Sequence, residues 1–208
     1  SFPTRRSSDL KSSYGLRLRC NFLKFLTGET TRGIDFNVSG LEYLDLRNSH
    51  LTTHQLWCVI PFNLRFLFLS GNRIGMTINT KNAAIFRNMH LLEKLELSRN
   101  ELTALPSELF KRLYNLTHLD LSENKLNSST SHIFQDLQNL RFLDLSRNRL
   151  SNLPPEFFQA FSRLQFINLS FNQLDAFDAS FSYIPSILSV DLYRNKLTML
   201  DINTTHFY

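Results

Sequence analysis

Residues 92–174 contain four copies of one unit: LEKLELSRNEL begins at Leu92, LTHLDLSENKL at Leu116, LRFLDLSRNRL at Leu140 and LQFINLSFNQL at Leu164. They fit the pattern L-x-x-L-x-L-x-x-N-x-L, with Ile167 replacing the second leucine in the fourth copy, and their starts lie 24 residues apart. A fixed period of this length indicates an architecture in which each unit stacks on its neighbours. The repeat therefore predicts a solenoid.

Weaker copies of the unit extend the pattern in both directions. LRFLFLSGNRI begins at Leu64 and ILSVDLYRNKL at Ile187, whereas LEYLDLRNSHL from Leu41 has Ser49 in place of the asparagine. A degenerate unit precedes them. We therefore expect residues 11–208 to form one solenoid segment of about eight repeats, at 13–40, 41–63, 64–91, 92–115, 116–139, 140–163, 164–186 and 187–208.

The leucines of each unit alternate with polar residues, as in LEKLEL and LTHLDL. Such alternation predicts a short strand with one buried and one solvated face. One coil cannot bury its apolar face alone, so neighbouring coils must stack. The expected fold is an α/β solenoid with a concave parallel β-sheet and an irregular or short-helical convex side. Leu95, Leu119, Leu143 and Ile167 should then lie one above another.

An asparagine column follows the predicted strands. A short amide at this point can bond backbone groups that the turn would otherwise bury unpaired. We expect these asparagines to be structural rather than ligand contacts. The column consists of Asn72, Asn100, Asn124, Asn148, Asn172 and Asn195.

A phenylalanine recurs about ten residues after the asparagine, at Phe110, Phe134, Phe158 and Phe181. A column of rings would fill the space behind the leucines, and it accounts for part of the 19 phenylalanines. Prolines such as Pro154 begin this part of the unit. They predict extended or turn-rich convex segments rather than long helices.

The full 24-residue frame resembles the extracellular class of leucine-rich repeat, and residues 41–208 resemble part of a Toll-like receptor ectodomain. Leu64 and Leu92 lie 28 rather than 24 residues apart, and such irregular units favour the Toll-like family. The resemblance implies a non-catalytic leucine-rich-repeat horseshoe that recognises a ligand. It also implies the extracellular or lumenal part of a single-pass membrane protein, at the cell surface or in the endosome. The alternatives are an extracellular matrix or cell-adhesion repeat protein and the regulatory repeat domain of an intracellular enzyme.

The same resemblance implies the partners. They are a protein or microbial ligand and a receptor dimer partner, with no cofactor and no membrane contact by this segment. Mixed charge on the outward strand positions argues against a dedicated phosphate-tracking groove. Nucleic acid is therefore a possible ligand but not the favoured one.

The outward strand positions are the candidate site, because function in a solenoid normally lies on its exposed sheet. The first outward row reads Tyr43, Phe66, Lys94, His118, Phe142, Phe166 and Ser189. Exposed aromatic side chains resemble the anchors of a protein interface, although lateral packing of the rings is the competing interpretation. The predicted ligand or partner contacts are Tyr43, Phe66, Phe68, Lys94, His118, Phe142, Phe166, Phe171 and Tyr193.

The second outward row is largely acidic and reads Asp45, Phe68, Glu96, Asp120, Asp144, Asn168 and Asp191. Carboxylates on strands about 4.8 Å apart could attract a cation such as calcium. The row is flanked by the bases Lys94, Arg99, Arg141 and Arg147. We expect these bases to neutralise the carboxylates, and no metal site is predicted.

His118, Asp120 and Ser122 share one face of a predicted strand but do not predict a catalytic triad. Alternate residues of a strand stand about 6.6 Å apart, and here the carboxylate lies between the other two groups. The sequence also lacks G-x-S-x-G, phosphate-loop, H-E-x-x-H and C-x-x-C motifs. We expect no enzymatic activity.

Glycosylation sequons of the form N-x-S/T occur at Asn37, Asn115, Asn127, Asn168 and Asn203. Asn115 precedes a predicted strand and is a plausible acceptor. Asn168 should point onto the concave surface, where a glycan would block access by a partner.

The composition fits a folded repeat segment: of 208 residues, 42% are hydrophobic and 20% charged, with a formal net charge of +5. Residues 1–10, SFPTRRSSDL, match the in-frame translation of a common sequencing adapter, and we expect them to be non-native. The first methionine is Met76 and no signal segment precedes it, so the chain is interpreted as a fragment. Cys20 and Cys58 are expected on different sides of the coil, too far apart to pair.

Overall fold

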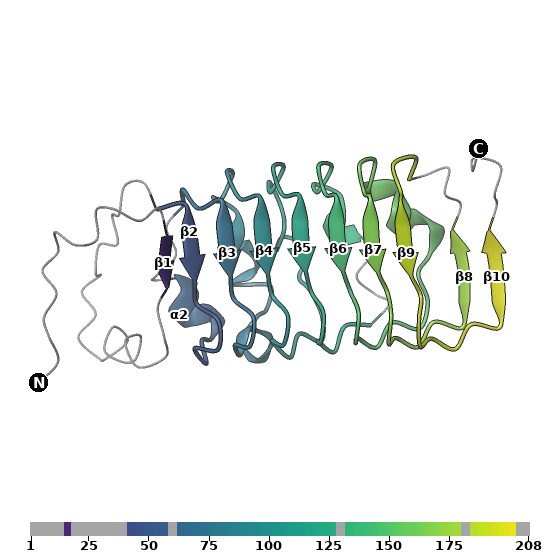
Figure 1. Ribbon diagram of the computed structural model, residues 1–208. Coiled ribbons are helices and arrows are strands. Elements are labelled where there is room, and N and C mark those ends of the chain that lie inside the picture. Colours follow the sequence, from purple (N-terminus) through teal and green to yellow (C-terminus); the bar gives the residue numbers. More distant parts are fainter. Residues whose placement is uncertain (1–14, 18–40, 58–61, 128–131, 180–183, 203–208) are drawn as a thin grey trace, which may run out of the picture.

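The computed structural model describes residues 15–17, 41–57, 62–127, 132–179 and 184–202, which form a row of stacked coils (Figure 1). Within these ranges, eight strands make one parallel sheet in the order β1-β2-β3-β4-β5-β6-β7-β9. Their bounds are β1 (Gly15–Arg17), β2 (Tyr43–Asp45), β3 (Phe66–Phe68), β4 (Lys94–Glu96), β5 (His118–Asp120), β6 (Phe142–Asp144), β7 (Phe166–Asn168) and β9 (Ser189–Asp191). Several residues named above lie outside the described ranges, namely residues 1–10, Cys20, Asn37, Cys58, Phe181 and Asn203.

Strand pairing keeps one register from coil to coil. Leu95 pairs with Leu119, Leu119 with Leu143, and Leu143 with Ile167. The next pair joins Ile167 to Val190 in the last strand of the sheet. Equivalent residues of successive repeats therefore lie one above another, and the predicted solenoid is confirmed.

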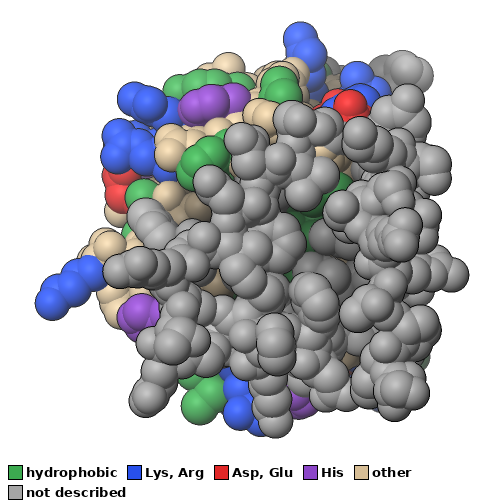
Figure 2. Space-filling view, turned by 90° about the vertical axis from the view of Figure 1, so that its left-hand side faces the viewer, with side chains coloured by type: hydrophobic (Ala, Val, Ile, Leu, Met, Phe, Trp, Pro, Cys, Tyr) green, Lys and Arg blue, Asp and Glu red, His purple; other side chains and the backbone are tan. Residues whose placement is uncertain are grey.

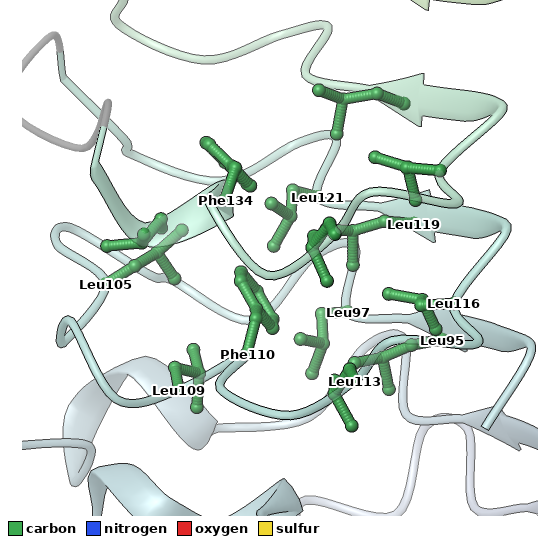
Figure 3. Packing of buried hydrophobic residues seen from close by; sticks show 14 of the residues in the cluster. Leu95, Leu97, Leu105, Leu109, Phe110, Leu113, Leu116, Leu119, Leu121 and Phe134 are labelled. Carbon is green, nitrogen blue, oxygen red and sulfur yellow. The ribbon is translucent and has the colours of Figure 1, made fainter. Parts of the chain in front are cut away.

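The hydrophobic core lies directly behind the sheet. In β4, β5 and β6 the middle leucine is buried and its two neighbours are half-exposed, as the alternation predicts. Figure 3 shows Leu97 and Leu121 lying between the strand leucines and the rings of Phe110 and Phe134. Burying one such leucine contributes roughly 1.5–3 kcal/mol. Most of this burial is against the adjacent coils, so a coil is stable only within the stack.

The convex side consists of short helices and turns, which confirms the predicted irregular or short-helical form. The helices are α2 (Thr53–Trp57) and the 3-10 helices η2 (Ile74–Met76), η3 (Ala83–Phe86) and η5 (Pro155–Ala160). Pro154 caps η5 with an extended backbone conformation, in agreement with the constraint that proline places on its neighbours. No helix of the described ranges has both the length and the apolar character needed to cross a bilayer.

The last two coils replace the convex helix with strands. β8 (Ala176–Ala179) pairs in parallel with β10 (Met199–Ile202), and β8 also contacts η5. In Figure 1 these two strands lie at the C-terminal end of the row and run opposite to the main sheet. The sequence did not predict this pair, because the two segments lie in the convex part of the repeat, outside the alternating leucine pattern that predicts the strands of the main sheet.

The phenylalanine column is partly as predicted. The rings of Phe110 and Phe134 are buried and stacked, with centroids 6.0 Å apart. From Phe134 the ring contacts continue to Phe157 at 5.5 Å and Phe161 at 5.6 Å. Phe158, the predicted member, is buried beside Phe157 at 5.1 Å. The predicted Phe158 thus lies in the core, and Phe157 and Phe161, which the ten-residue spacing did not name, continue the ring contacts from Phe134.

Each column asparagine joins two coils through its side-chain amide. The Nδ2 of Asn124 donates to the carbonyl of Leu121 in its own coil at 2.9 Å and to that of Leu97 in the preceding coil at 3.0 Å. Its Oδ1 accepts from the N–H groups of Asn100 and Leu102, both at 3.0 Å. The same donation to two coils recurs at Asn72, Asn100, Asn148, Asn172 and Asn195. The amides thereby satisfy backbone groups that the stacked turns would otherwise bury unpaired.

The residue before each column position has a left-handed backbone. Its φ is 55° at Arg99, 53° at Glu123 and 54° at Arg147. A non-glycine residue pays roughly 1–2 kcal/mol for this conformation. Its N–H in return reaches the next coil, as in the 3.1 Å bond from Arg99 to the carbonyl of Ser122. Only Gly71 is a glycine among the equivalent described residues Asn48, Gly71, Arg99, Glu123, Arg147, Phe171 and Arg194.

The long repeat from Leu64 approaches the next coil closely at Gly75. The N–H of Gly75 donates to the carbonyl of Asn100 at 2.9 Å. A Cβ atom at this position would collide with the backbone of Glu101 and Leu102. The extra length of this repeat is therefore accommodated by a glycine that lets two backbones touch.

We expect Asn124→Ala to lower the free energy of unfolding by about 2–4 kcal/mol, because several buried backbone groups lose their partner at once. Asn88→Ala, at an exposed position outside the column, should change it by less than about 0.5 kcal/mol. Denaturant unfolding followed by circular dichroism measures both values. Equal losses in the two variants would show that the column is not what holds the coils together.

Candidate binding site on the concave sheet

The common register places the third residue of every repeat in one row across the sheet. Each member lies opposite its neighbour in the pairing of adjacent strands. The row reads Tyr43, Phe66, Lys94, His118, Phe142, Phe166 and Ser189. The structure therefore brings the first predicted outward row together as a continuous surface.

Three rings of this row form a stacked ladder, which we call the aromatic ladder: His118, Phe142 and Phe166. The imidazole of His118 lies 4.3 Å from the ring of Phe142 with an interplanar angle of 11°. Phe142 lies 4.7 Å from Phe166 at 7°. Both spacings match the separation of hydrogen-bonded strands, so the sheet itself sets the stacking distance. The ladder ends at Phe166, whose side chain is 37% exposed.

The aromatic residues at the N-terminal end of the row pack together with cations. Tyr43 lies 4.9 Å from the ring of Phe68, and the guanidinium of Arg47 lies over that ring at 5.2 Å. The ammonium of Lys94 lies over the same ring at 5.3 Å. Phe68 is consequently only 8% exposed. The prediction of an open contact at Phe68 is wrong, because flanking side chains cover the ring.

The second outward row is held by hydrogen bonds as much as by ion pairs. Glu96 pairs with Lys94 at 3.0 Å, as expected from the flanking bases. Asp120 instead accepts the backbone N–H of Ser122 at 2.9 Å, and Asp144 accepts that of Ser146 at 2.8 Å. The turn that follows each strand thus supplies a backbone donor that holds the carboxylate in place.

Two of the predicted neutralising bases point elsewhere. Arg99 pairs with Glu123 at 2.8 Å, beyond the end of the strand. Arg147 lies over the ring of Phe171, 4.1 Å from its centroid. No group of three acidic, histidine or cysteine side chains in the described part of the chain is arranged to hold a metal ion.

The aromatic ladder and the acidic row line one open cavity of about 410 Å³ on the concave face. The rings form its apolar part and the carboxylates of Asp120 and Asp144 its polar part. A site of this kind suits a ligand that combines a flat or apolar group with hydrogen-bond donors. Its lining also includes Lys94, Glu96, Asn168, Ser189 and Asp191.

His118 is engaged in packing rather than in a catalytic triad. Its Nδ1 shares a 2.8 Å hydrogen bond with the hydroxyl of Thr117, while the carboxylate of Asp120 receives a backbone N–H. Burial lowers the pKa of the His118 imidazole, and the positive charges of Lys94 and Arg141 lower it further. The neutral ring is therefore the form that stacks on Phe142.

Two predicted contacts, Phe171 and Tyr193, lie outside this cavity. The strands end at Asn168 and Asp191, and the chain then turns toward the next convex segment. The left-handed backbone of Phe171 directs its ring to the rim of the sheet, where it lies 5.6 Å from the ring of Tyr193. Their placement on the concave face was wrong, because a position past the strand no longer follows the strand's alternation.

The sequons fall in different environments. Asn115 and Asn127 are exposed. Asn168 is half-buried, and its Nδ2 donates to Asp144 at 3.1 Å while its Oδ1 accepts the hydroxyl of Ser170 at 2.7 Å. Because Asn115 and Asn127 are exposed and Asn168 is half-buried, accessibility favours Asn115 and Asn127 as acceptors.

A second asparagine ladder, which sequence reasoning missed, runs along the edge where the strands begin. The Nδ2 of Asn115 donates to the carbonyl of His90, and that of Asn139 to the carbonyl of Tyr114, both at 2.7 Å. Asn139 also accepts a 2.7 Å bond from Arg163. The available signal was an asparagine directly before the first leucine of two successive repeats. Asn115 and Asn139 line a second cavity of about 410 Å³ on this flank of the solenoid.

Replacing His118 by phenylalanine should change how stability depends on pH. Because the pKa of His118 is lowered on folding, its contribution is complete above about pH 6.5 and is lost as the pH falls below that value. His118→Phe keeps a ring in the ladder but cannot be protonated, so it should lose less stability than the wild type between pH 7.5 and pH 5. Thermal unfolding at several pH values measures this, and parallel curves for the two proteins would contradict it.

Comparisons with known proteins agree with this geometry. Residues 90–150 and 143–197, more than half of the chain, match the family model described as leucine rich repeat. The crystal structure of the TLR13–ssRNA13 complex aligns with a TM-score of 0.61 and 26% identity, over 80% of this chain and 27% of that one. The leucine-rich repeat domain of APL1B aligns with a TM-score of 0.56 and 26% identity, over 66% of this chain and 38% of that one.

The search of curated proteins found no match. The chain spans well under half the length of either solved structure to which it is similar. The 24-residue register, the asparagine column and the family match lead to one assignment: this chain belongs to the leucine-rich-repeat family.

Proposed function

We propose that this chain is part of the ligand-recognition ectodomain of a Toll-like receptor and that it binds through its concave surface. The observation that carries the proposal is the aromatic ladder, which ends in an exposed ring beside a cavity of about 410 Å³. Stacked rings on a sheet give a rigid apolar platform at low cost in conformational entropy. A protein or microbial ligand would place an apolar group on this platform.

Polar groups in the same cavity would fix the orientation of a bound ligand. The carboxylates of Asp120 and Asp144 line the cavity, and each is anchored by a backbone N–H of its own turn. Asp144 also accepts the side-chain amide of Asn168 at 3.1 Å. Because these acceptors are already held in place, they lose little conformational entropy when they bind a donor. The favoured ligand therefore carries hydrogen-bond donors or a positive group next to its apolar part.

Similarity to TLR13 supports the Toll-like assignment over the matrix or adhesion alternative. The long repeat from Leu64, with its close backbone approach at Gly75, is the kind of irregular unit that favours this family. On this proposal the protein lies outside the cell or in a vesicle lumen, is anchored by a membrane helix elsewhere in the protein, and pairs with a second receptor chain. It carries out no chemistry of its own.

The TLR13 structure contains single-stranded RNA, and this raises RNA as a second ligand class. In the cavity of this chain, Glu96, Asp120, Asp144 and Asp191 all contribute carboxylates. A phosphate backbone laid on the concave face would meet these negative charges directly. RNA is therefore a less favoured ligand class than a protein or a lipid-bearing ligand.

Removing the ladder should weaken binding at the concave face. We expect Phe142→Ala together with Phe166→Ala to weaken the binding of a concave ligand at least about tenfold, because two adjacent apolar contacts are lost. The probes are a synthetic lipopeptide, a microbial protein fraction and a short single-stranded RNA. Binding is followed by surface plasmon resonance with the intact chain.

Tyr114→Ala is the matched control, because Tyr114 is 51% exposed but lies on the flank. It should leave the affinity within about twofold of the wild type. If no probe binds, or if the ladder substitutions leave the affinity of a bound probe unchanged, the proposal that ligands bind to the concave face is wrong.

Glycopeptide mapping after secreted expression tests the proposed location. We expect glycans on Asn115 and Asn127, which are exposed, and little or none on Asn168, which is half-buried. Full-length transcript sequencing should reveal a membrane helix and an intracellular Toll-type domain. Unmodified Asn115 and Asn127 would favour the intracellular alternative, and a transcript without a membrane helix would favour the matrix alternative.

A further inference from the structure

A second surface, separate from the concave cavity, lies where the last strands of the main sheet end. We call it the rim cluster and define it by two exposed rings and four exposed cations. These are Phe171, Tyr193, Arg147, Arg149, Arg194 and Lys196. They occupy the turn after β6, β7 and β9, past the residues that line the cavity.

The rings and two of the arginines form one continuous array. Arg147 lies over the ring of Phe171 at 4.1 Å, and Phe171 meets Tyr193 edge-on with centroids 5.6 Å apart. Arg194 lies 5.4 Å from the centre of the Tyr193 ring and donates its Nε–H to the phenol oxygen at 3.1 Å. Even so, Tyr193 remains 60% exposed. Arginine and tyrosine held in this way are the residues most often found at the energetic centre of protein interfaces.

The backbone under the array is fixed. Arg147, Phe171 and Arg194 all have a positive φ, near 55°. The N–H of Arg147 donates to the carbonyl of Ser170 at 2.9 Å, and that of Phe171 to the carbonyl of Tyr193 at 2.8 Å. The side chains are therefore presented by turns that stacking has already ordered, and little freedom remains to be lost on binding.

The cations of the rim cluster form no ion pairs among the described residues, unlike Arg99 and Lys125 earlier along the same rim, although, after Arg99, Arg147 also contributes to lowering the pKa of Glu123. There, Arg99 pairs with Glu123 and Lys125 with Glu101, each at 2.8 Å. These bonds raise the pKa of Arg99 and lower the pKa of Glu123 and Glu101. By contrast, none of the four cations of the rim cluster forms an ion pair with any residue that the structure describes.

Figure 2 gives the view from the N-terminal end of the molecule. In Figure 2 the visible Lys and Arg side chains lie at several separate places around the outline, some of them next to acidic side chains.

We propose that the rim cluster is a docking surface for an acidic segment of a protein partner, in which Asp or Glu residues flank an apolar side chain. The carboxylates of such a segment would pair with the four cations, and its apolar side chain would cover Phe171 and Tyr193. This surface is independent of the concave cavity and does not require that the cavity bind a ligand.

Neighbouring carboxylates favour a protein segment over a polyphosphate or a sulfated glycan. Asp191 accepts the N–H of Tyr193 at 2.9 Å, so a negative charge lies directly beside the cluster on its concave side. Asp144 holds the N–H of Ser146 in the same way, next to Arg147. A uniformly charged polyanion would be repelled along this edge, whereas a segment with alternating acidic and apolar residues can keep its charges on the outer side.

The test uses the full chain and a fluorescent ten-residue peptide that contains four acidic and two aromatic residues. We expect it to bind, with an affinity that falls as salt is raised, and its counterpart with Gln and Asn in place of the acids to bind at least about tenfold more weakly. Arg147→Gln with Arg194→Gln should weaken binding of the acidic peptide by about tenfold, and Tyr193→Ala by about threefold to tenfold. Fluorescence anisotropy measures each affinity.

The matched control is Arg99→Gln with Lys125→Gln, which removes the same charge from the compensated part of the rim. It should change the affinity less than about twofold. Equal weakening by both double variants, or no binding of the acidic peptide, would overturn the proposal. So would tighter binding of a single-stranded oligonucleotide or a heparin fragment with the same dependence on Arg147 and Arg194. Phe166→Ala should leave peptide binding unchanged, which keeps this outcome separate from that of the concave proposal.

Discussion

The structure depends on hydrogen bonds that one coil can complete only with the next. In every turn after a strand the backbone points polar groups into the core, and a column asparagine such as Asn124 satisfies those of its own coil and of the preceding coil together. The left-handed residue before it sends its N–H onward to the following coil. Each coil is therefore stable as part of a stack, and the leucine core behind the sheet adds its burial energy to a register that the turns have set.

That register produces the candidate site. Equivalent residues of successive repeats lie one strand spacing apart. Aromatic residues at the third position of successive repeats therefore stack, as His118, Phe142 and Phe166 do. The adjacent position brings carboxylates into line in the same manner. Backbone N–H groups of the following turn hold the carboxylates of Asp120 and Asp144 in place. The concave face thus combines an apolar ladder with fixed acceptors, which is the basis for assigning recognition to it.

Side chains on the rim are not oriented by strand alternation, because the strand has already ended there. Side chains there are directed by a left-handed residue and project away from the cavity. Along the earlier coils opposite charges meet across this rim, as Arg99 and Glu123 do. In the later coils rings replace the acidic partners, so Arg147 and Arg194 lie against Phe171 and Tyr193 instead. One repeat unit therefore offers two surfaces whose chemistry varies independently.

The sequence by itself determined the solenoid, the pairing of strands, the buried leucines and the identity of the two outward rows, because a 24-residue period and strict alternation leave one way to bury the leucines. Only the tertiary structure decided how those rows are used. In the structure, Arg47 and Lys94 cover Phe68, Phe157 and Phe161 join the aromatic stripe, Phe171 and Tyr193 lie on the rim, and β8 pairs with β10. These features depend on contacts between side chains of different coils and on turn geometry, neither of which a periodic pattern contains.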